Sequence, residues 1–177
     1  PTLALLDADP RRDDRVAQLH TLNEIGRLLS GVLDLDTLLE AIYSATRRLV
    51  DASVFFIAFY DESSDMLDLA YIAHDGVLQP QPQRWPSNIG LAGLVMRERQ
   101  PLRTDDYLNE CRRRGVQPRP FIDSAAVHAW LGVPLLAHDR LLGVMSISSY
   151  RADYSYSAEH TDLLMTIAAQ GAVAIEN

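Results

Sequence analysis

The sequence has 177 residues, of which 47% are hydrophobic and 23% are charged, and its formal net charge is −8. This composition is typical of one globular domain, excludes a chain that is disordered throughout, and argues against nucleic-acid binding, which needs a basic face. The single cysteine excludes a disulfide framework and any zinc or iron–sulfur site built from several cysteines. No apolar run approaches the roughly 20 residues that span a bilayer, and the first residues lack the features of a signal peptide. We therefore expect a cytoplasmic domain.

The N-terminal part of the chain is predicted to be helical. Residues 1–12 show little periodicity and are expected to form a flexible lead-in, and residues 13–177 are expected to form one domain. From Asp13 onward, apolar residues recur at steps of three and four, which is the period of an amphipathic helix. A second helix is predicted to begin near Thr37, because Thr37 and Glu40 have the spacing of a capping box.

Two hairpins account for the main predicted strands. The first joins residues 51–60 to residues 66–73 across a polar turn, and its unbroken apolar run predicts a strand covered on both faces. The second joins residues 126–136 to residues 141–149 across a short turn. Hairpins separated by helices favour an antiparallel sheet over a parallel one.

The middle of the chain is predicted to consist of loops and short elements. Residues 74–90 contain three prolines and are expected to be a loop, and a loop of this length in a compact domain is usually functional or mobile. Short helices are predicted over residues 91–98 and 105–114, with a short edge strand over residues 101–104 between them. Ser157 is predicted to cap the last helix.

The order of these elements predicts the fold class α/β, of the α+β type. We expect a central antiparallel sheet of five or six strands, with the terminal helices on one face and pocket-covering helices and loops on the other. The last helical pattern continues to Asn177 without a stop signal, so we expect the sequence to be a segment of a longer protein.

With these elements in place, the chain resembles the GAF domain family, whose relatives, the PAS domains, are shorter and lack this C-terminal ending. The resemblance covers about residues 15–177. The ordered set of segments that carries it is Leu38-Leu-Glu-Ala-Ile42, Val54-Phe-Phe-Ile-Ala-Phe-Tyr-Asp61, Gly90-Leu-Ala-Gly93, Leu131-Gly-Val-Pro-Leu135, Leu142-Gly-Val-Met-Ser-Ile147 and the closing residues 168–177.

The resemblance implies a non-catalytic sensory module of a larger signalling protein. Such domains bind a small molecule in a pocket on one face of the sheet, and their terminal helices dimerise and continue into an effector domain. The parent implied is a bacterial sensor histidine kinase, a cyclic-dinucleotide enzyme or a transcriptional activator, with the histidine kinase preferred. The alternative is a dimerisation spacer that binds no ligand.

The candidate ligand-binding residues follow from aligning Asp61 with the aspartate that ends the family's first strand. This alignment places Phe56, Ala58 and Tyr60 on the pocket face, and it turns Phe55, Ile57 and Phe59 toward the terminal helices. The other candidates lie in the cover or in nearby strand segments, and they are Trp85, Gly90, Phe121, Ser124, His128 and Trp130. An aromatic lining with few polar groups suits a small organic ligand.

The candidate dimerisation surface lies on the terminal helices. It comprises Leu19, Leu22, Gly26 and Leu29 on the first helix and Ile167, Gly171 and Ile175 on the last. Small residues allow helices to approach closely, so we expect a homodimer built on these helices. A small molecule and a covalently linked effector domain are the other expected partners, and no contact with nucleic acid or membrane is expected.

The better-known ligands and activities of the family match this sequence poorly. At the places of the cyclic-nucleotide pattern, Asn-Lys, Phe and Asp-Glu, the chain has Arg151, Tyr156 and His160-Thr161. Bilin attachment needs a cysteine usually followed by histidine, whereas Cys111 is followed by arginine. The family's methionine-sulfoxide reductases resolve a sulfenic acid with a second thiol, which one cysteine does not supply. We expect no catalytic residue, no metal site and no required cofactor, and cyclic nucleotide, bilin and haem are the lesser alternatives.

Arginine is concentrated in one segment of this acidic chain. Residues 97–119 contain seven of the 16 basic residues of the chain against four acidic ones. Because this segment would cover the pocket, one interpretation is recognition of an anionic ligand, and the other is a solvated arginine-rich helix face. Cys111 lies in the same segment, where arginine neighbours would lower the pKa of its thiol and allow a redox role.

Overall fold

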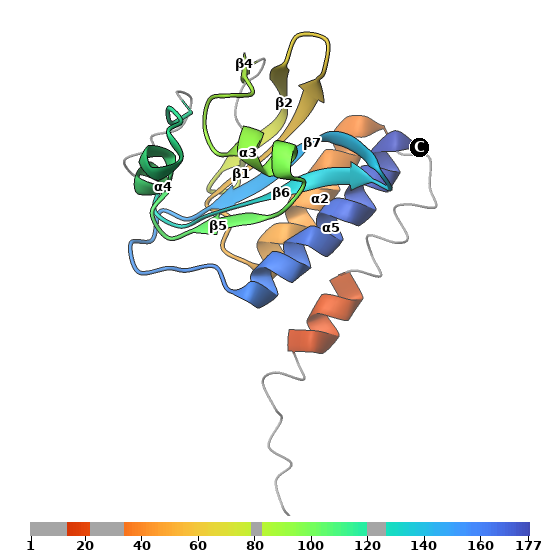
Figure 1. Ribbon diagram of the computed structural model, residues 1–177. Helices are drawn as coiled ribbons and strands as arrows, with labels where there is room; N and C mark the ends of the chain where they lie inside the picture. The colour runs from red at the N-terminus through yellow and green to blue at the C-terminus, as the bar shows by residue number, and fades with distance from the viewer. Residues whose placement is uncertain (1–13, 22–33, 79–82, 120–126) are drawn as a thin grey trace, which may run out of the picture.

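The strands form one antiparallel sheet in which the order is β3-β2-β1-β7-β6-β5, and β4 pairs with β2 beside this path. The computed structural model describes residues 14–21, 34–78, 83–119 and 127–177 (Figure 1). The strands are β1 Val54–Asp61, β2 Met66–His74, β3 Val77–Leu78, β4 Arg84–Pro86, β5 Leu102–Thr104, β6 Trp130–Ala137 and β7 Arg140–Ser148. The antiparallel α+β class predicted from the two hairpins is confirmed.

Helices cover both faces of this sheet. They are α2 Leu35–Leu49, α3 Ala92–Glu98, α4 Tyr107–Arg114 and α5 Ala158–Glu176, and residues 14–21 form a further helical segment. Helices α2 and α5 lie side by side on one face, whereas α3 and α4 lie on the other (Figure 1). In the parts of the chain that the structure describes, no helix is both long and apolar enough to cross a membrane.

The segment predicted as one loop, residues 74–90, contains two short strands instead. Strand β3 pairs with the end of β2, and in β4 Trp85 pairs with Leu67 of β2. A strand of two or three residues is too short to show the alternation of apolar and polar residues that predicts a strand. It is recognised only by its hydrogen bonds to the neighbouring strand. The loop prediction was therefore wrong for residues that lie against β2.

Local side-chain caps set where the two long helices begin. The prediction of a helix start near Thr37 was late, because α2 begins at Leu35 and the Asp34 carboxylate accepts a hydrogen bond of 2.8 Å from the Thr37 amide. The prediction for α5 is confirmed, since the Ser157 hydroxyl accepts from the His160 amide. Asp34 and Ser157 are both residue types whose oxygens satisfy the unpaired amides of a first helical turn.

Alternate residues of β1 separate two apolar cores. Phe55 and Ile57 are fully buried among residues of α2 and α5. Phe56 and Ala58 are equally buried, but under α3 and α4. The face assignment made by aligning Asp61 with the family's strand-ending aspartate is thus confirmed, and the second core contains the candidate site.

Candidate functional site

A small cavity lies in the core under α3 and α4. Its volume is about 10 Å³, the size of one water molecule. Aromatic rings from three elements line it: Phe56 from β1, Trp85 from β4 and Trp130 from β6. Among its described lining residues only Ile89 is not buried, so Ile89 marks the side nearest to solvent.

Arg119 extends its side chain into this aromatic core. The residue is only 2% exposed, and its guanidinium carbon lies 4.3 Å from the centre of the Phe56 ring and 4.9 Å from that of Trp85. None of its three side-chain nitrogens has a hydrogen-bond partner among the described residues. Burial lowers the pKa of the Arg119 guanidinium to about 10, so the group stays charged at neutral pH.

Two backbone hydrogen bonds hold the segment that carries Arg119. The Gly90 amide donates to the Gln117 carbonyl at 2.6 Å, and the Arg119 amide donates to the Tyr107 hydroxyl at 3.3 Å. Gly90 has a φ of +74°, which favours glycine, and a Cβ there would lie 3.1 Å from the Tyr107 hydroxyl. Burial raises the pKa of the Tyr107 phenol to about 12, so it remains a neutral acceptor. Arg119 is therefore part of a fixed wall.

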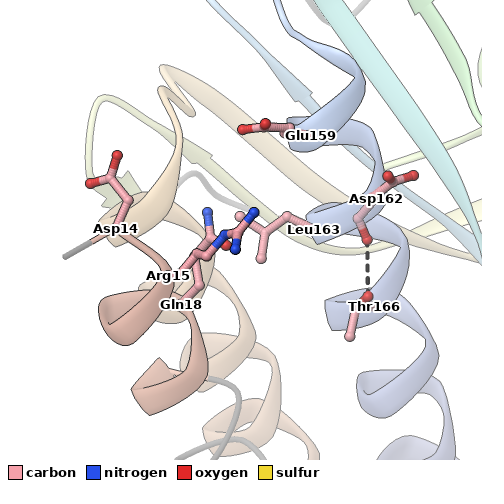
Figure 2. Close-up of a pocket in the computed structure, with 7 residues that line it drawn as sticks. All are labelled: Asp14, Arg15, Gln18, Glu159, Asp162, Leu163 and Thr166. Atoms are coloured by element: carbon pink, nitrogen blue, oxygen red, sulfur yellow. Dashed lines mark hydrogen bonds between the residues drawn. The ribbon is translucent and has the colours of Figure 1, made fainter. Parts of the chain in front are cut away.

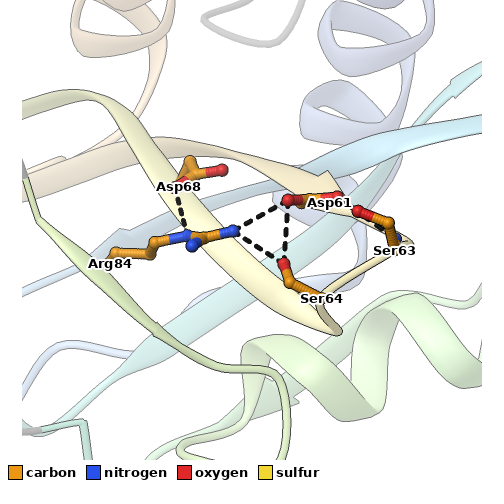
Figure 3. A network of polar contacts seen from close by, with 5 residues as sticks. All are labelled: Asp61, Ser63, Ser64, Asp68 and Arg84. Atoms are coloured by element: carbon orange, nitrogen blue, oxygen red, sulfur yellow. Dashed lines mark hydrogen bonds and ion pairs between the residues drawn. The ribbon is translucent and has the colours of Figure 1, made fainter.

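A surface ion-pair network holds β4, and with it Trp85, against the sheet (Figure 3). Arg84 is 2.8 Å from Asp61 at the end of β1 and 2.8 Å from Asp68 of β2. The neighbouring Trp85 is buried, and its ring packs edge-on against Phe56 with centroids 5.9 Å apart. The exposed side of β4 thus positions an aromatic wall of the cavity.

His74 adds a second polar nitrogen on this side of the sheet. It lies two residues beyond Ile72, whose side chain belongs to the same core, at the end of β2. Its Nε2 atom is buried and has no hydrogen-bond partner in the described part of the chain. Burial, and then the positive charge of Arg119, lower the pKa of the His74 imidazole below 6.5. The carboxylate of Asp75 has the opposite, smaller effect on the pKa of His74, so Arg119 is the larger of the two charges acting on it.

The other arginines of residues 97–119 lie at the surface. Arg113 and Arg114 both pair with Glu110, at 3.1 Å and 2.9 Å, and Arg103 donates to the Tyr156 carbonyl. Of the seven, all of them described, Arg119 is the one that is buried. The arginine-rich helix face is thus solvated, while one arginine enters the core.

Cys111 does not have the environment that was expected for a reactive thiol. It is 1% exposed beside Tyr107, and burial raises the pKa of its thiol. The expectation that neighbouring arginines lower this pKa was wrong, because their side chains point to solvent while the thiol faces the core. The described residues also include no group of three His, Cys, Asp or Glu side chains that could hold a metal ion.

The structure brings several of the predicted ligand-binding residues together. Phe56, Trp85, Gly90 and Trp130 line the cavity, and Ala58 is buried in the same core. Tyr60 is only partly buried, and its hydroxyl donates to Asp65 at 2.7 Å. His128 is partly buried, and its backbone pairs with Tyr107 and Ser149. Phe121 and Ser124 lie outside the described residues. Their contact with a ligand stays a prediction.

Sequence reasoning missed Arg119 and Tyr107 as individual residues of the site. Arg119 was counted within the arginine-rich segment, where neither charge nor hydrophobic period separates it from the exposed arginines. The flanking Pro118 and Pro120 are the one local feature that sets it apart, since they exclude it from a helix interior.

The predicted dimerisation residues occupy different environments. Ile167 and Gly171 of α5 are buried in the chain's own core, where a Cβ on Gly171 would lie 2.8 Å from Ile42 of α2. Ile175 is partly buried against the same core. On the helical segment 14–21, Leu19 is 62% exposed. Leu22, Gly26 and Leu29 lie outside the described residues, as do residues 1–12 of the predicted lead-in.

A second hollow separates the helical segment 14–21 from the start of α5 (Figure 2). Its volume is about 400 Å³, and it is lined by Asp14, Arg15, Gln18, Glu159, Asp162, Leu163 and Thr166. Three of these residues are acidic and one is an arginine, and the hollow is open to solvent. It is a polar gap between two helices and differs in its lining from the aromatic cavity.

The sheet with two helices on one face and a small cavity under short helices on the other defines a GAF-type domain. A family model described as "GAF domain" matches residues 32–176, and the chain belongs to this family.

Solved structures of several GAF domains and of free methionine-R-sulfoxide reductases share the fold. The GAF domain of a phosphoenolpyruvate-protein phosphotransferase from Coxiella burnetii has a TM-score of 0.72 at 19% identity, covering 91% of this chain and 94% of that one. The GAF-B domain of DevS from Mycobacterium smegmatis has a TM-score of 0.62 at 20% identity, covering 81% and 93%. The free methionine-R-sulfoxide reductase from Neisseria meningitidis, solved with its substrate, has a TM-score of 0.66 at 16% identity, covering 90% and 88%.

Proposed function

We propose that this chain is a cytoplasmic, non-catalytic sensory domain that binds a small molecule in the cavity beside Arg119 and regulates an effector domain. The observation that carries the proposal is the small aromatic cavity with a buried guanidinium that has no acceptor among the described residues. A binding site in a regulatory domain typically combines an apolar wall with a few convergent polar groups. The core under α3 and α4 has this composition.

Strand β1 contacts both the cavity and the long helices, one on each of its faces. Phe56 packs on the cavity side, and its neighbour Phe55 packs against Tyr43 of α2 with ring centroids 4.9 Å apart. A ligand that binds one arrangement of these rings better than another shifts the population of the corresponding helix arrangement. We propose that α2 and α5 carry this shift to an effector such as a sensor histidine kinase.

The chemistry of Cys111 supports a regulatory role over a reductase role, although a reductase shares the fold. Reduction of a sulfoxide by thiols passes through a sulfenic acid that a second thiol must resolve. This chain has one cysteine, which is buried and has a raised pKa. No thiol-based turnover is therefore part of the proposal.

A dimerisation spacer without a ligand is the second candidate function. Two observations favour it: the cavity is no larger than a water molecule, and Val16 and Leu19 expose 59% and 62% of their surface on one side of a helix. The occupant we propose for that helix face is a second copy of this chain.

Native mass spectrometry of the protein as purified, compared with its denatured mass, tests the two functions against each other. A retained non-covalent molecule supports the sensory domain and gives the ligand's mass. A ligand-free dimer, together with no change in tryptophan emission on addition of cell metabolites, contradicts the sensory domain and supports the spacer.

A further inference from the structure

The Arg119 guanidinium is a buried charged group that finds no hydrogen-bond partner among the described residues. Its positive charge lies within an aromatic core, and its three nitrogens lack acceptors among the described residues. Stacking on aromatic rings offsets part of the lost hydration of a cation. It does not satisfy the five N–H donors, which need oxygen acceptors.

We infer that the cavity is a recognition site for an oxyanion group, carboxylate or phosphate, of a small molecule, and that Arg119 is the residue that binds this group. The inference rests on the proposed function and names the class of ligand for the same site. Guanidinium groups bind both oxyanions through paired N–H donors.

The charges around the cavity favour an anion over a cation. The described lining residues include no Asp or Glu, so no carboxylate of the wall competes for Arg119. His74 is close enough for the charge of Arg119 to act on it, and it also has a nitrogen without a partner among the described residues. The Tyr107 hydroxyl is engaged with the Arg119 amide. A cationic ligand would meet a fixed positive charge.

Hydrogen bonds to its backbone fix the position of Arg119 beside the cavity. The Gly90 amide donates to the Gln117 carbonyl, and the Arg119 amide donates to the Tyr107 hydroxyl. Both hydrogen bonds fix the backbone on the same side of the cavity. A ligand therefore meets a guanidinium that is already oriented, which lowers the entropic cost of binding.

The dimensions of the cavity define how such a ligand enters. About 10 Å³ accepts one oxygen-sized atom beside the guanidinium, so the body of a larger anion must push the cavity walls apart. Ile89 is the partly exposed wall residue, and it precedes Gly90. Displacement of Ile89 would place the organic part of the ligand between this segment and the rings of Trp85 and Trp130.

Tryptophan fluorescence tests the inference directly, because the two tryptophans of the chain both line the cavity. Wild type and Arg119→Met are titrated with sodium benzoate, with benzamide, which has the same shape without the charge, and with inorganic phosphate. Sodium chloride controls for ionic strength. Arg112→Met, at an exposed position of the same segment, is the matched variant.

The expected result is saturable benzoate or phosphate binding to the wild type and to Arg112→Met. Benzamide should bind at least about tenfold more weakly, and Arg119→Met should lose the preference for the charged probe. Benzoate without phosphate binding identifies a carboxylate site, and the reverse identifies a phosphate site. Arg119→Lys, which keeps the charge but not the planar donors, should bind more weakly than wild type.

Three results overturn the inference, and they differ in what they say about the proposed function. Equal affinities for benzoate and benzamide, or an unchanged benzoate affinity in Arg119→Met, refute the role of Arg119 but leave a small-molecule pocket. No response to any probe up to about 20 mM, beyond the millimolar range of weak ligands, refutes the anion site. In that last case, a neutral molecule retained in native mass spectrometry would still support the proposed function as a sensory domain. Should Arg119→Met fail to fold, the benzoate–benzamide pair in the wild type and the Arg119→Lys variant decide the question.

Discussion

The guanidinium carbon of Arg119 lies 4.3 Å from the centre of the Phe56 ring, on the opposite side of β1 from the Tyr43–Phe55 contact. One strand therefore carries the wall of the cavity on one face and a contact to α2 on the other. Phe55 and Phe56 are each no more than 2% exposed, so neither ring moves without its neighbours. If the proposed ligand displaces Phe56, this tight packing would shift Phe55 and α2 as well.

Replacing Arg119 with methionine is expected to stabilise the ligand-free protein. A buried charge without a partner is unfavourable, whereas methionine fills similar space between the aromatic rings. We expect the free energy of unfolding to rise by about 1–3 kcal/mol, measured by urea denaturation after removal of bound ligand by unfolding and refolding. The exposed Arg112→Met should change it by less than about 0.5 kcal/mol. A marked loss of stability in Arg119→Met would show that the guanidinium has a partner in the ligand-free protein.

Gly90→Ala should cost more than Gly115→Ala, although both glycines have a positive φ, +74° and +71°. A Cβ at Gly115 meets nothing within 4 Å, so its cost is the backbone conformation alone, about 1 kcal/mol. A Cβ at Gly90 would lie 3.1 Å from the Tyr107 hydroxyl and 3.4 Å from the Arg119 Cβ, which raises the cost to about 2–3 kcal/mol.

Urea denaturation of the two glycine variants measures this difference, and tryptophan emission reports whether the cavity changes. Emission should shift in Gly90→Ala and stay unchanged in Gly115→Ala. Equal unfolding free energies with equal spectra would contradict the role given to Gly90 in holding the wall that carries Arg119.

Much of the fold was predictable because its determinants are local. The period of β1 assigned Phe55 and Phe56 to opposite faces, and that assignment holds since a strand alternates its side chains. Ser157 predicted the start of α5, since a hydroxyl before a helix satisfies the amides of its first turn. Asp34 acts in the same way for α2, but Thr37, three residues later, offered a competing cap.

The candidate site was less predictable because long-range contacts create it. Arg119 is one of seven arginines in its segment, and its burial depends on Gly90 and Tyr107, which lie 29 and 12 residues earlier in the sequence. Trp85 reached the cavity through β4, whose pairing with β2 has no periodic pattern to reveal it. A charge pattern indicates where an anion could bind, but tertiary packing selects the residue.

Arg84→Gln is expected to disturb the cavity with little change in overall stability. Arg84, Asp61 and Asp68 are all substantially exposed, and exposed ion pairs contribute about 0–1 kcal/mol each. Their loss loosens β4, so the emission of Trp85 should shift toward that of a hydrated indole. Arg140→Gln is the matched variant. It breaks an exposed ion pair of 3.0 Å between Arg140 and Glu176, which does not involve β4. A spectral change of the same size in Arg140→Gln would show that the network has no specific link to the cavity.

Acidification should weaken the start of α5 through His160. Its neutral Nδ1 accepts a hydrogen bond of 3.1 Å from the Ser157 amide, and protonation of Nδ1 removes that acceptor. Burial, together with the charge of Arg103, lowers the pKa of His160 below 6.5 in the folded chain, against the opposing effect of Glu159. The unfolded chain thus binds the proton first. The stability contributed by neutral His160 is complete above about pH 6.5, and it is lost as the pH falls through the lower folded pKa.

His160→Gln tests this pH dependence, because glutamine supplies an oxygen acceptor that does not titrate. Between about pH 7.5 and about pH 5, the variant should lose on the order of 1 kcal/mol less unfolding free energy than wild type. His74, whose pKa is also lowered by burial, contributes with the same sign, so some loss remains in the variant. His74→Gln with wild-type His160 separates the two contributions. Parallel pH profiles for wild type and His160→Gln would contradict the role of the capping box.

Leu19→Glu and Val16→Glu are expected to shift the protein from dimer to monomer. The two side chains lie three residues apart on one side of the helical segment 14–21, and they expose 62% and 59% of their surface to solvent in a single chain. A second copy would bury them, and a carboxylate at either position would oppose that burial. Ala17→Glu adds the same charge on a different side of the helix and should leave the mass measured by size-exclusion chromatography with light scattering unchanged. Ile167 and Gly171 already pack inside each chain, so they are not free to form the dimer. A wild type that is monomeric at every concentration tested would therefore contradict the helical dimer, and with it the spacer function.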